Sequence, residues 1–215
     1  MNPKTKKKKG IRIVVQNVNG ISNTTKSEIV EKALMDSEGD VLLQLDTRLH
    51  TDVQTRRTRL GKWNPKFAGN RNNSKRGIQL NVNPRSPAQS INEVYDPNGN
   101  YLISEMIFAN NPLLLVAVYA PNEDNVEWWE NLYQIIEKMD YRDVIIIGDS
   151  NQIMDPELDS KNYKTNVMTY KPKCRNLLNS WLNSDTYVDI FREQNPLTKE
   201  YTWKKFSSTY VPVKD

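Results

Sequence analysis

The chain has very few of the residues that build disulfides, zinc sites or membrane spans. Its 215 residues include one cysteine, Cys174, and one histidine, His50. A lone cysteine forms no internal disulfide or cysteine-based zinc site, so we expect Cys174 to be a partly buried small apolar residue and His50 a surface loop residue. No apolar run approaches the roughly 18 residues of a membrane span, and no hydrophobic signal segment follows Met1. We therefore expect an intracellular protein, nuclear or cytoplasmic, that is not secreted.

The chain also lacks a linker rich in glycine, serine or proline that would divide it into domains. Hydrophobic residues make up only 37% of the sequence, but they are concentrated in dense aliphatic runs, which a folded core requires. We therefore expect a flexible basic tail over residues 1–10 and a single domain over residues 11–215.

Positive charge is concentrated in two places, although the net charge is only +4. A lysine cluster over residues 4–9 and a basic stretch from Arg56 to Arg76, with Trp63 and Phe67 between its charges, both predict a nucleic-acid partner. The alternatives are a solvated tail or a nuclear-import signal for the first, and for the second an ordinary basic loop whose aromatic rings pack into the core.

Short aliphatic runs that lead into polar residues are the most informative pattern in the sequence. Such runs are too short for core helices and are typical of strands, and ligands of sheet-based folds commonly bind beyond strand ends. The runs and the residues that follow them are Ile11–Val15 with Asn17, Val41–Leu45 with Asp46, Leu113–Val118 with Tyr119, and Asp143–Ile147 with Asp149 and Asn151.

The remaining elements are predicted from periodicity and turn residues. Gly77–Val82 and Tyr101–Phe108 are expected to form an outer antiparallel segment, and the two buried strands Leu113–Val118 and Asp143–Ile147 to lie in the core. The predicted helices are Ser27–Ser37, Val126–Met139 and Asn176–Leu182, and further short strands are predicted at Tyr187–Ile190 and Glu200–Trp203.

The residues after the strands could together hold a metal ion and a phosphate. Carboxylate and amide oxygens, with almost no histidine or cysteine, favour Mg²⁺ or Mn²⁺ over zinc or copper. Such an ion acts on phosphate esters, and a carboxylate such as Asp149 can deprotonate an attacking water. If the segment stays extended, the side chains of Asp149 and Asn151 point the same way into the site.

Several of these segments resemble a known family. Asn17–Ile21, Tyr119–Asn122, Gly148–Asn151 and Glu200–Trp203, in this order, resemble the endonuclease domain of LINE-type non-LTR retrotransposons, which belongs with apurinic/apyrimidinic endonucleases in the endonuclease/exonuclease/phosphatase superfamily. Asp96–Leu102 and Asp189–Arg192 look like further family segments, so the resemblance spans residues 11 to about 203.

The resemblance implies an α/β fold, a two-sheet sandwich flanked by helices, and a Mg²⁺- or Mn²⁺-dependent endonuclease that acts on DNA. It also implies roles for individual residues. Asn17 and Asp46 would help to hold the metal, Tyr119 would contact the phosphate, Asp149 would be the general base, Asn151 would position phosphate or water, and Thr202 would lie near the scissile phosphate.

The sequence departs from the family pattern at three places. Asp46 stands where the family usually has glutamate, and Ser150 stands where it usually has phenylalanine. The family's closing Asp and terminal Ser-Asp-His have no good match here, so we expect a chain that stops before its last strands and final catalytic residues. We expect this chain to have little or no nuclease activity unless the closing segments are added. Two alternatives remain: a phosphatase or deadenylase of the same fold, or an inactive remnant that binds nucleic acid.

Overall fold

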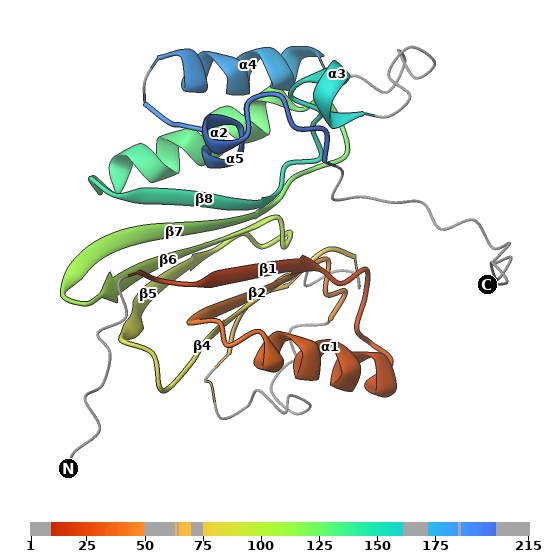
Figure 1. Cartoon of the computed structure of the whole chain (residues 1–215), viewed down its shortest axis with the longest axis vertical. Helices are drawn as coiled ribbons and strands as arrows, with labels where there is room; N and C mark the ends of the chain where they lie inside the picture. Colours follow the sequence, from red (N-terminus) through yellow and green to blue (C-terminus); the bar gives the residue numbers. More distant parts are fainter. Residues whose placement is uncertain are drawn as a thin grey trace, which may run out of the picture. The chain divides into compact units, whose positions relative to one another are not determined.

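The computed structural model describes residues 10–49, 63, 65–69, 75–160, 172–184 and 186–200. The chain divides into two compact units, and Figure 1 labels their helices and strands. The sheet unit comprises Met1–Asn122 and Glu130–Asn151, and the helical unit comprises Glu123–Trp129 and Gln152–Asp215. The lysine cluster, His50, Thr202 and most of the basic stretch lie outside the described residues, as does most of the strand predicted at Glu200–Trp203.

The first sheet of the sheet unit has the strand order β1-β2-β4-β3. β1 (Ile13–Asn17) runs parallel to β2 (Val41–Leu45), whereas β4 (Ile78–Val82) pairs antiparallel with both β2 and β3 (Lys66–Ala68). Helix α1 (Thr24–Asp36) makes the connection from β1 to β2 that parallel strands require. It starts at Asn23, whose side chain accepts a hydrogen bond from the backbone N–H of Lys26 at 3.1 Å.

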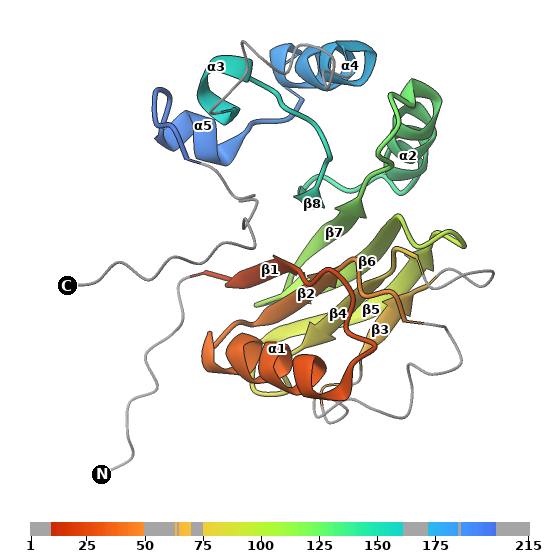
Figure 2. The ribbon, with the colours of Figure 1, turned by 90° about the vertical axis from the view of Figure 1, so that its right-hand side faces the viewer.

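The second sheet has the strand order β5-β6-β7-β8 (Figure 2). β5 (Ala88–Tyr95), β6 (Tyr101–Phe108) and β7 (Asn111–Tyr119) form an antiparallel meander, and β8 (Val144–Asp149) runs parallel to β7. Helix α2 (Val126–Lys138) provides the connection between these two parallel strands. Each sheet therefore contains one parallel pair, whose carboxyl ends lie at the same edge of that sheet.

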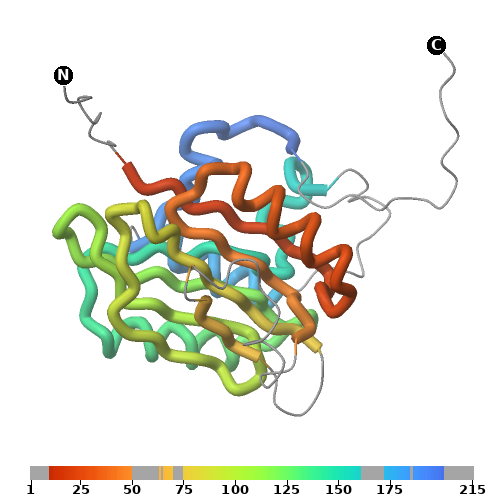
Figure 3. Tube along the Cα trace, turned by 90° about the horizontal axis from the view of Figure 1, so that it is seen from below, coloured from red at the N-terminus to blue at the C-terminus, as the bar shows by residue number. Residues whose placement is uncertain are grey.

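The two sheets pack face to face over a common apolar core, and the chain path through them can be followed in Figure 3. The core residues alternate along the strands, as expected for a sandwich. They include Val41, Leu43, Leu45, Ile78 and Leu80 of the first sheet and Leu102, Met106, Leu115 and Ala117 of the second. At the rim, Lys66 of β3 forms an ion pair with Glu93 of β5 at 3.2 Å, so the edge strands are also joined.

The outer face of the first sheet is covered by helix α1. Leu34 of the helix packs on Leu42 of β2, and Trp63 packs against the same cluster. Trp63 thus follows the alternative in which an aromatic residue of the basic stretch packs into the core, and Phe67, in β3, is half-buried. None of the helices in the described part of the chain has the length and hydrophobicity that a membrane span requires.

The helical unit contains α3 (Pro156–Asp159), α4 (Pro172–Asn183) and α5 (Ile190–Gln194). Cys174 is fully buried, where partial burial was expected, and its backbone N–H donates to Asp124 at 2.9 Å. The ring of Trp181 contacts that of Trp129 at 6.0 Å and that of Tyr187 at 6.2 Å, measured between centroids. These aromatic contacts are the apolar framework of the unit.

The fold class predicted from the sequence is confirmed: two four-stranded sheets pack as an α/β sandwich flanked by helices. The predicted boundaries of β2 are also confirmed, and those of α1, α2, α4, β1 and β7 agree with the structure to within a few residues. The strand predicted at Asp143–Ile147 exists as β8, but it is half-buried instead of buried, because β8 is the edge strand of its sheet.

The predicted outer segment of Gly77–Val82 with Tyr101–Phe108 is wrong, because these strands lie in different sheets. β4 is an interior strand whose polar residues are buried, and Gln79 donates to Asn81 at 2.9 Å, so its alternation of polar residues does not mark a solvent face. β6 pairs instead with β5, a strand that the sequence analysis missed because half of its residues are polar.

The strand predicted at Tyr187–Ile190 is also wrong. Asp189 accepts a hydrogen bond from the backbone N–H of Arg192 at 3.0 Å and is the N-cap of helix α5. An aspartate in that position favours the start of a helix over the continuation of a strand.

Gly148, next to Asp149 in β8, is the position where we expect substitution to disturb the fold most. Its φ is +146°, and a Cβ there would lie 2.0 Å from the carbonyl oxygen of Val118 in β7. We expect Gly148→Ala to lower the free energy of unfolding by on the order of 3 kcal/mol or more, measured by urea denaturation. Gly10→Ala, where nothing lies within 4 Å, is the control and should change it little. Equal stability of the two variants would contradict this close approach of β7 and β8.

Candidate active site

The carboxyl ends of β1 and β8 meet, although the two strands belong to different sheets. Asn17, the last residue of β1, donates a hydrogen bond from Nδ2 to Oδ2 of Asp149, the last residue of β8, at 3.0 Å. The orientation of the Asn17 amide is defined, because its Oδ1 accepts from the backbone N–H of Asn19 at 3.1 Å. Two residues that are 132 positions apart therefore form one polar pair.

The end of β2 carries an ion pair. Asp46 has a φ of +53° and is only 4% exposed. Arg48 turns back onto it, with Nη2 donating to Asp46 Oδ2 at 2.7 Å and Nε to Oδ1 at 3.2 Å. Arg48 Nη2 also donates to Asn19 Oδ1 at 2.6 Å, so the guanidinium links the loop after β2 to the loop after β1. The hydrogen bond with Asp46 is the main cause that raises the pKa of Arg48.

Tyr119 ends β7 and lies between the acidic and basic groups of the site. Burial raises the pKa of its half-buried hydroxyl, and the negative charges of Asp46 and Asp149 raise it further, while Arg48 and Arg76 act in the opposite direction. Because the pKa is above its ordinary value, the phenol keeps its proton at neutral pH and can donate a hydrogen bond to an anion.

The segment after β8 turns at Asn151 instead of remaining extended. Asn151 has a φ of +51°, and its backbone N–H donates to Asp149 Oδ1 at 2.9 Å. Its side-chain Nδ2 donates to the carbonyl of Ala120, after β7, at 2.7 Å. The two side chains were expected to point the same way only if the segment stayed extended, and it does not. Asn151 instead connects the ends of β7 and β8.

The structure brings five of the six predicted site residues to one end of the sandwich. These are Asn17, Asp46, Tyr119, Asp149 and Asn151, whereas Thr202 lies outside the described residues. The roles that the resemblance implies for them stay predictions.

Sequence reasoning missed two residues near Tyr119: Arg48, whose positive charge acts on its hydroxyl, and Asn100, which holds the end of its strand. Arg48 follows Asp46 by two positions, but an arginine in a loop is ordinarily a solvated surface residue. Asn100 lies in the turn between β5 and β6 and donates from Nδ2 to the carbonyl of Tyr119 at 2.8 Å. Arg76 was part of the predicted basic stretch, without a role of its own.

The donor atoms of the site fit a hard cation. Asn17 and Asp46 offer amide and carboxylate oxygens, which Mg²⁺ and Mn²⁺ prefer. The part of the chain that the structure describes contains no group of three or more histidine, cysteine or acidic residues that could enclose a metal alone.

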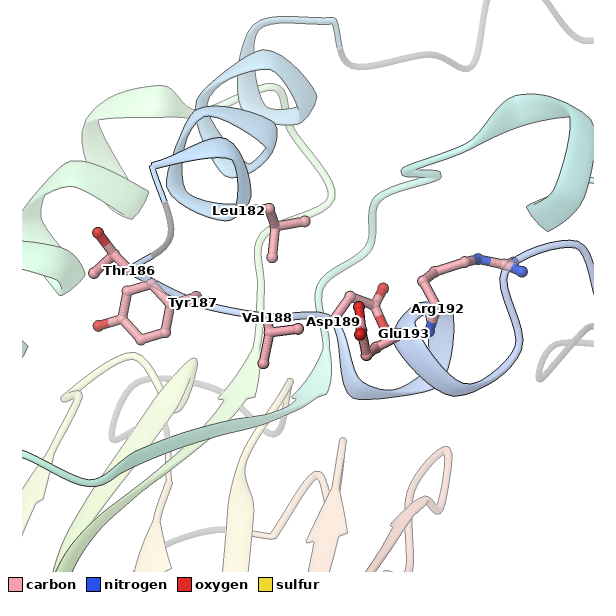
Figure 4. Close-up of a pocket in the computed structure, with 7 residues that line it drawn as sticks. All are labelled: Leu182, Thr186, Tyr187, Val188, Asp189, Arg192 and Glu193. Atoms are coloured by element: carbon pink, nitrogen blue, oxygen red, sulfur yellow. Dashed lines mark hydrogen bonds between the residues drawn. The ribbon is translucent and has the colours of Figure 1, made fainter.

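The helical unit has a pocket of about 450 Å³ (Figure 4). It is lined by Leu182, Thr186, Tyr187, Val188, Asp189, Arg192 and Glu193. None of the predicted site residues lines this pocket. The strand ends of the sheet unit, where the predicted residues converge, are therefore the candidate active site.

Solved structures share the fold of the chain. An apurinic/apyrimidinic endonuclease from Archaeoglobus fulgidus matches with a TM-score of 0.68 and 19% identity over 95% of this chain and 80% of that protein. The chain has the fold of apurinic/apyrimidinic endonucleases. The 3′-5′ exonuclease NExo from Neisseria meningitidis matches with a TM-score of 0.69 and 16% identity over 92% of this chain and 80% of that protein. The APE2 catalytic domain from Xenopus laevis matches with a TM-score of 0.64 and 18% identity over 88% of this chain and 74% of that protein. No model of a known protein family matches the sequence.

The Asp46–Arg48 ion pair should be measurable as a coupling energy. We expect a double-mutant cycle with Asp46→Asn and Arg48→Met to give a coupling of about 1 kcal/mol in the free energy of unfolding, because one partner is almost buried and the other is solvent-exposed. Urea denaturation at low and high salt is the measurement, and the coupling should fall as salt screens the exposed guanidinium. Strict additivity of the two substitutions at low salt would show that the pair contributes nothing.

Proposed function

We propose that this protein is a Mg²⁺-dependent phosphodiesterase that cleaves DNA internally, an endonuclease of the kind found in LINE-type retrotransposons. The observation that carries the proposal is the hydrogen bond between Asn17 and Asp149, which joins the strand ends of both sheets into one site with Asp46 and Tyr119. The fold supports it, since proteins that share this fold are named as apurinic/apyrimidinic endonucleases and a 3′-5′ exonuclease.

Asn17 and Asp46 are the residues that would hold the Mg²⁺ or Mn²⁺ ion. When bound, the ion polarises a phosphoryl oxygen and stabilises the negative charge that develops on the leaving oxygen. In the structure, Arg48 compensates the charge of Asp46, which is otherwise an almost buried carboxylate. Arg48 donates to both oxygens of Asp46, so a bound metal ion would share this carboxylate with the guanidinium.

Asp149 is the residue that would take the proton of the attacking water. Both of its oxygens are held, Oδ2 by the amide of Asn17 and Oδ1 by the backbone N–H of Asn151. A carboxylate accepts more than one hydrogen bond at each oxygen, so this arrangement fixes its orientation and leaves acceptor positions for a water molecule. A fixed base reacts faster, because it need not be oriented during the reaction.

Tyr119 would bind the phosphate as a neutral hydrogen-bond donor. Its raised pKa keeps the hydroxyl protonated, and the two arginines nearby favour an anion in the same place. The interaction should strengthen as negative charge builds on the phosphate oxygens, which is the condition for lowering the barrier. Asn151, whose amide holds the chain at Ala120, would keep this phosphate site next to Asp149.

The retrotransposon type is the finer part of the proposal, and it is supported by the sequence segments. Asn17–Ile21, Tyr119–Asn122 and Gly148–Asn151 resemble LINE endonucleases, and the structure brings residues of all three segments to the same end of the sandwich. DNA as the substrate also agrees with the lysine cluster of the N-terminal tail.

We expect the chain to nick supercoiled plasmid slowly in Mg²⁺ and to lose this activity in EDTA. Asp149→Asn should lower the rate by on the order of 10²- to 10³-fold, since it removes the base, and Tyr119→Phe by roughly ten- to a hundredfold, since it removes one hydrogen bond to a charged group. The assay uses enzyme in excess over DNA, so that slow turnover is still measured.

The control is Asp143→Asn, which makes the same charge change at the exposed residue just before β8, far along the strand from Asp149. It should nick at the wild-type rate. Wild-type protein that does not nick DNA, or nicking that Asp149→Asn leaves unchanged, would refute the proposed function.

A further inference from the structure

Arg76, in the loop before β4, is a cation of the site whose charge no carboxylate compensates among the described residues. Its guanidinium contacts a neutral group, the Oδ1 atom of Asn100, to which Nη1 donates at 2.8 Å. The second arginine of the site differs, because Arg48 is paired with Asp46. Arg76 is half-buried and close enough to Tyr119 for its charge to act on that hydroxyl.

The backbone holds Arg76 in place from the first sheet. The pairing of β2 with β4 continues past the strand ends, since the N–H of Thr47 donates to the carbonyl of Gly77 at 3.1 Å and the N–H of Arg48 to that of Arg76 at 2.7 Å. Arg76 has a φ of +66°, and Arg48 a φ of +55°. Non-glycine residues seldom adopt this conformation, so the backbone is held by its surroundings at both arginines.

The second sheet holds Arg76 through Asn100. This residue is 2% exposed, and its backbone N–H donates to Asp96 Oδ2 at 2.8 Å. Its Nδ2 donates to the carbonyl of Tyr119 at 2.8 Å, and its own carbonyl accepts from the N–H of Tyr119 at 2.7 Å. The same asparagine therefore positions both the guanidinium of Arg76 and the end of the strand that carries Tyr119.

The charges of the site show what this arrangement is suited to bind. Arg48 compensates Asp46, and Asp149 is held by the neutral amide of Asn17 and a backbone N–H. A half-buried guanidinium held by an amide oxygen keeps its full charge and further N–H donors for an anion. A phosphate group matches these donors, because its oxygens accept two parallel hydrogen bonds from one guanidinium.

We propose that Arg76 binds the substrate phosphate next to Tyr119, with Asn100 as the residue that positions both. The inference rests on the proposed function and adds to it a phosphate-binding residue from the loop before β4, near the hydroxyl of Tyr119. A purely structural role, bracing the β5–β6 turn through Asn100, would need the hydrogen bond but not the charge. The two roles differ in their salt dependence.

The test is the binding of a short fluorescein-labelled DNA duplex by the full chain, followed by anisotropy in EDTA over a series of NaCl concentrations. Each phosphate that a protein cation neutralises releases a counterion, so Arg76→Gln should reduce the slope of log Kd against log salt by about one and weaken binding. Arg76→Lys should keep the slope. Arg85→Gln removes the same charge from an exposed turn after β4 and should leave the slope unchanged.

A second measurement uses the wild-type chain alone, so it does not depend on the folding of any variant. Phenylglyoxal modifies accessible arginines, and mass spectrometry identifies them. We expect bound duplex to protect Arg76 from modification but not Arg85. A wild-type slope in Arg76→Gln, a similar loss of slope in Arg85→Gln, or modification of Arg76 that DNA does not slow would each overturn the proposal.

Together with the nicking assay, these measurements distinguish a failure of the Arg76 proposal from a failure of the proposed function. Wild-type chain that binds duplex with the expected Arg76 dependence but does not nick plasmid would leave Arg76 as a phosphate-binding residue and refute the nuclease. Nicking that depends on Asp149, with no effect of Arg76→Gln on binding, would refute the role of Arg76 alone. Wild-type chain that does not bind the duplex at all would overturn both.

Discussion

The hydrogen bond between Asn17 and Asp149 is the contact through which the two sheets share one polar site. Each sheet contains one parallel strand pair, β1 with β2 and β7 with β8, and parallel strands end at the same edge. A sandwich could bury the same apolar core with these edges apart. Because Asn17 contacts Asp149, the ends of β1, β2, β7 and β8 instead lie together. The charges of Asp46 and Asp149 therefore act on the hydroxyl of Tyr119.

The backbone at this end of the sandwich is held in conformations that side chains other than glycine seldom adopt. Asp46, Arg48, Arg76 and Asn151 all have a φ between +51° and +66°. Such conformations are unfavourable and persist where surrounding hydrogen bonds determine them. Here the bonds are those of the extended β2–β4 pairing and of Asn151 with Ala120. The apolar sandwich thus stabilises a polar end in which the charged groups are fixed before any ligand binds.

The strands and most of the predicted site could be derived from the sequence, because both depend on local patterns. Buried aliphatic runs such as Val41–Leu45 indicate strands wherever they occur, and the polar residue after each run marks its end. The features that the sequence did not predict depend on tertiary structure. The burial of Gln79 and Asn81 between strands cannot be seen in an alternating pattern, and the pairing of Arg48 with Asp46 depends on a turn that reverses the side-chain direction.

We propose that Asn17 and Asp46, at the ends of two parallel strands, form a cation site. The most direct measurement is anomalous diffraction from crystals of the protein soaked in Mn²⁺. We expect a peak at about 2.0–2.2 Å from a carboxylate oxygen of Asp46, with the amide oxygen of Asn17 among the ligands, and loss of this peak in Asp46→Asn. A peak bound by other residues, or no peak at the strand ends while Arg48 still covers Asp46, would contradict the account.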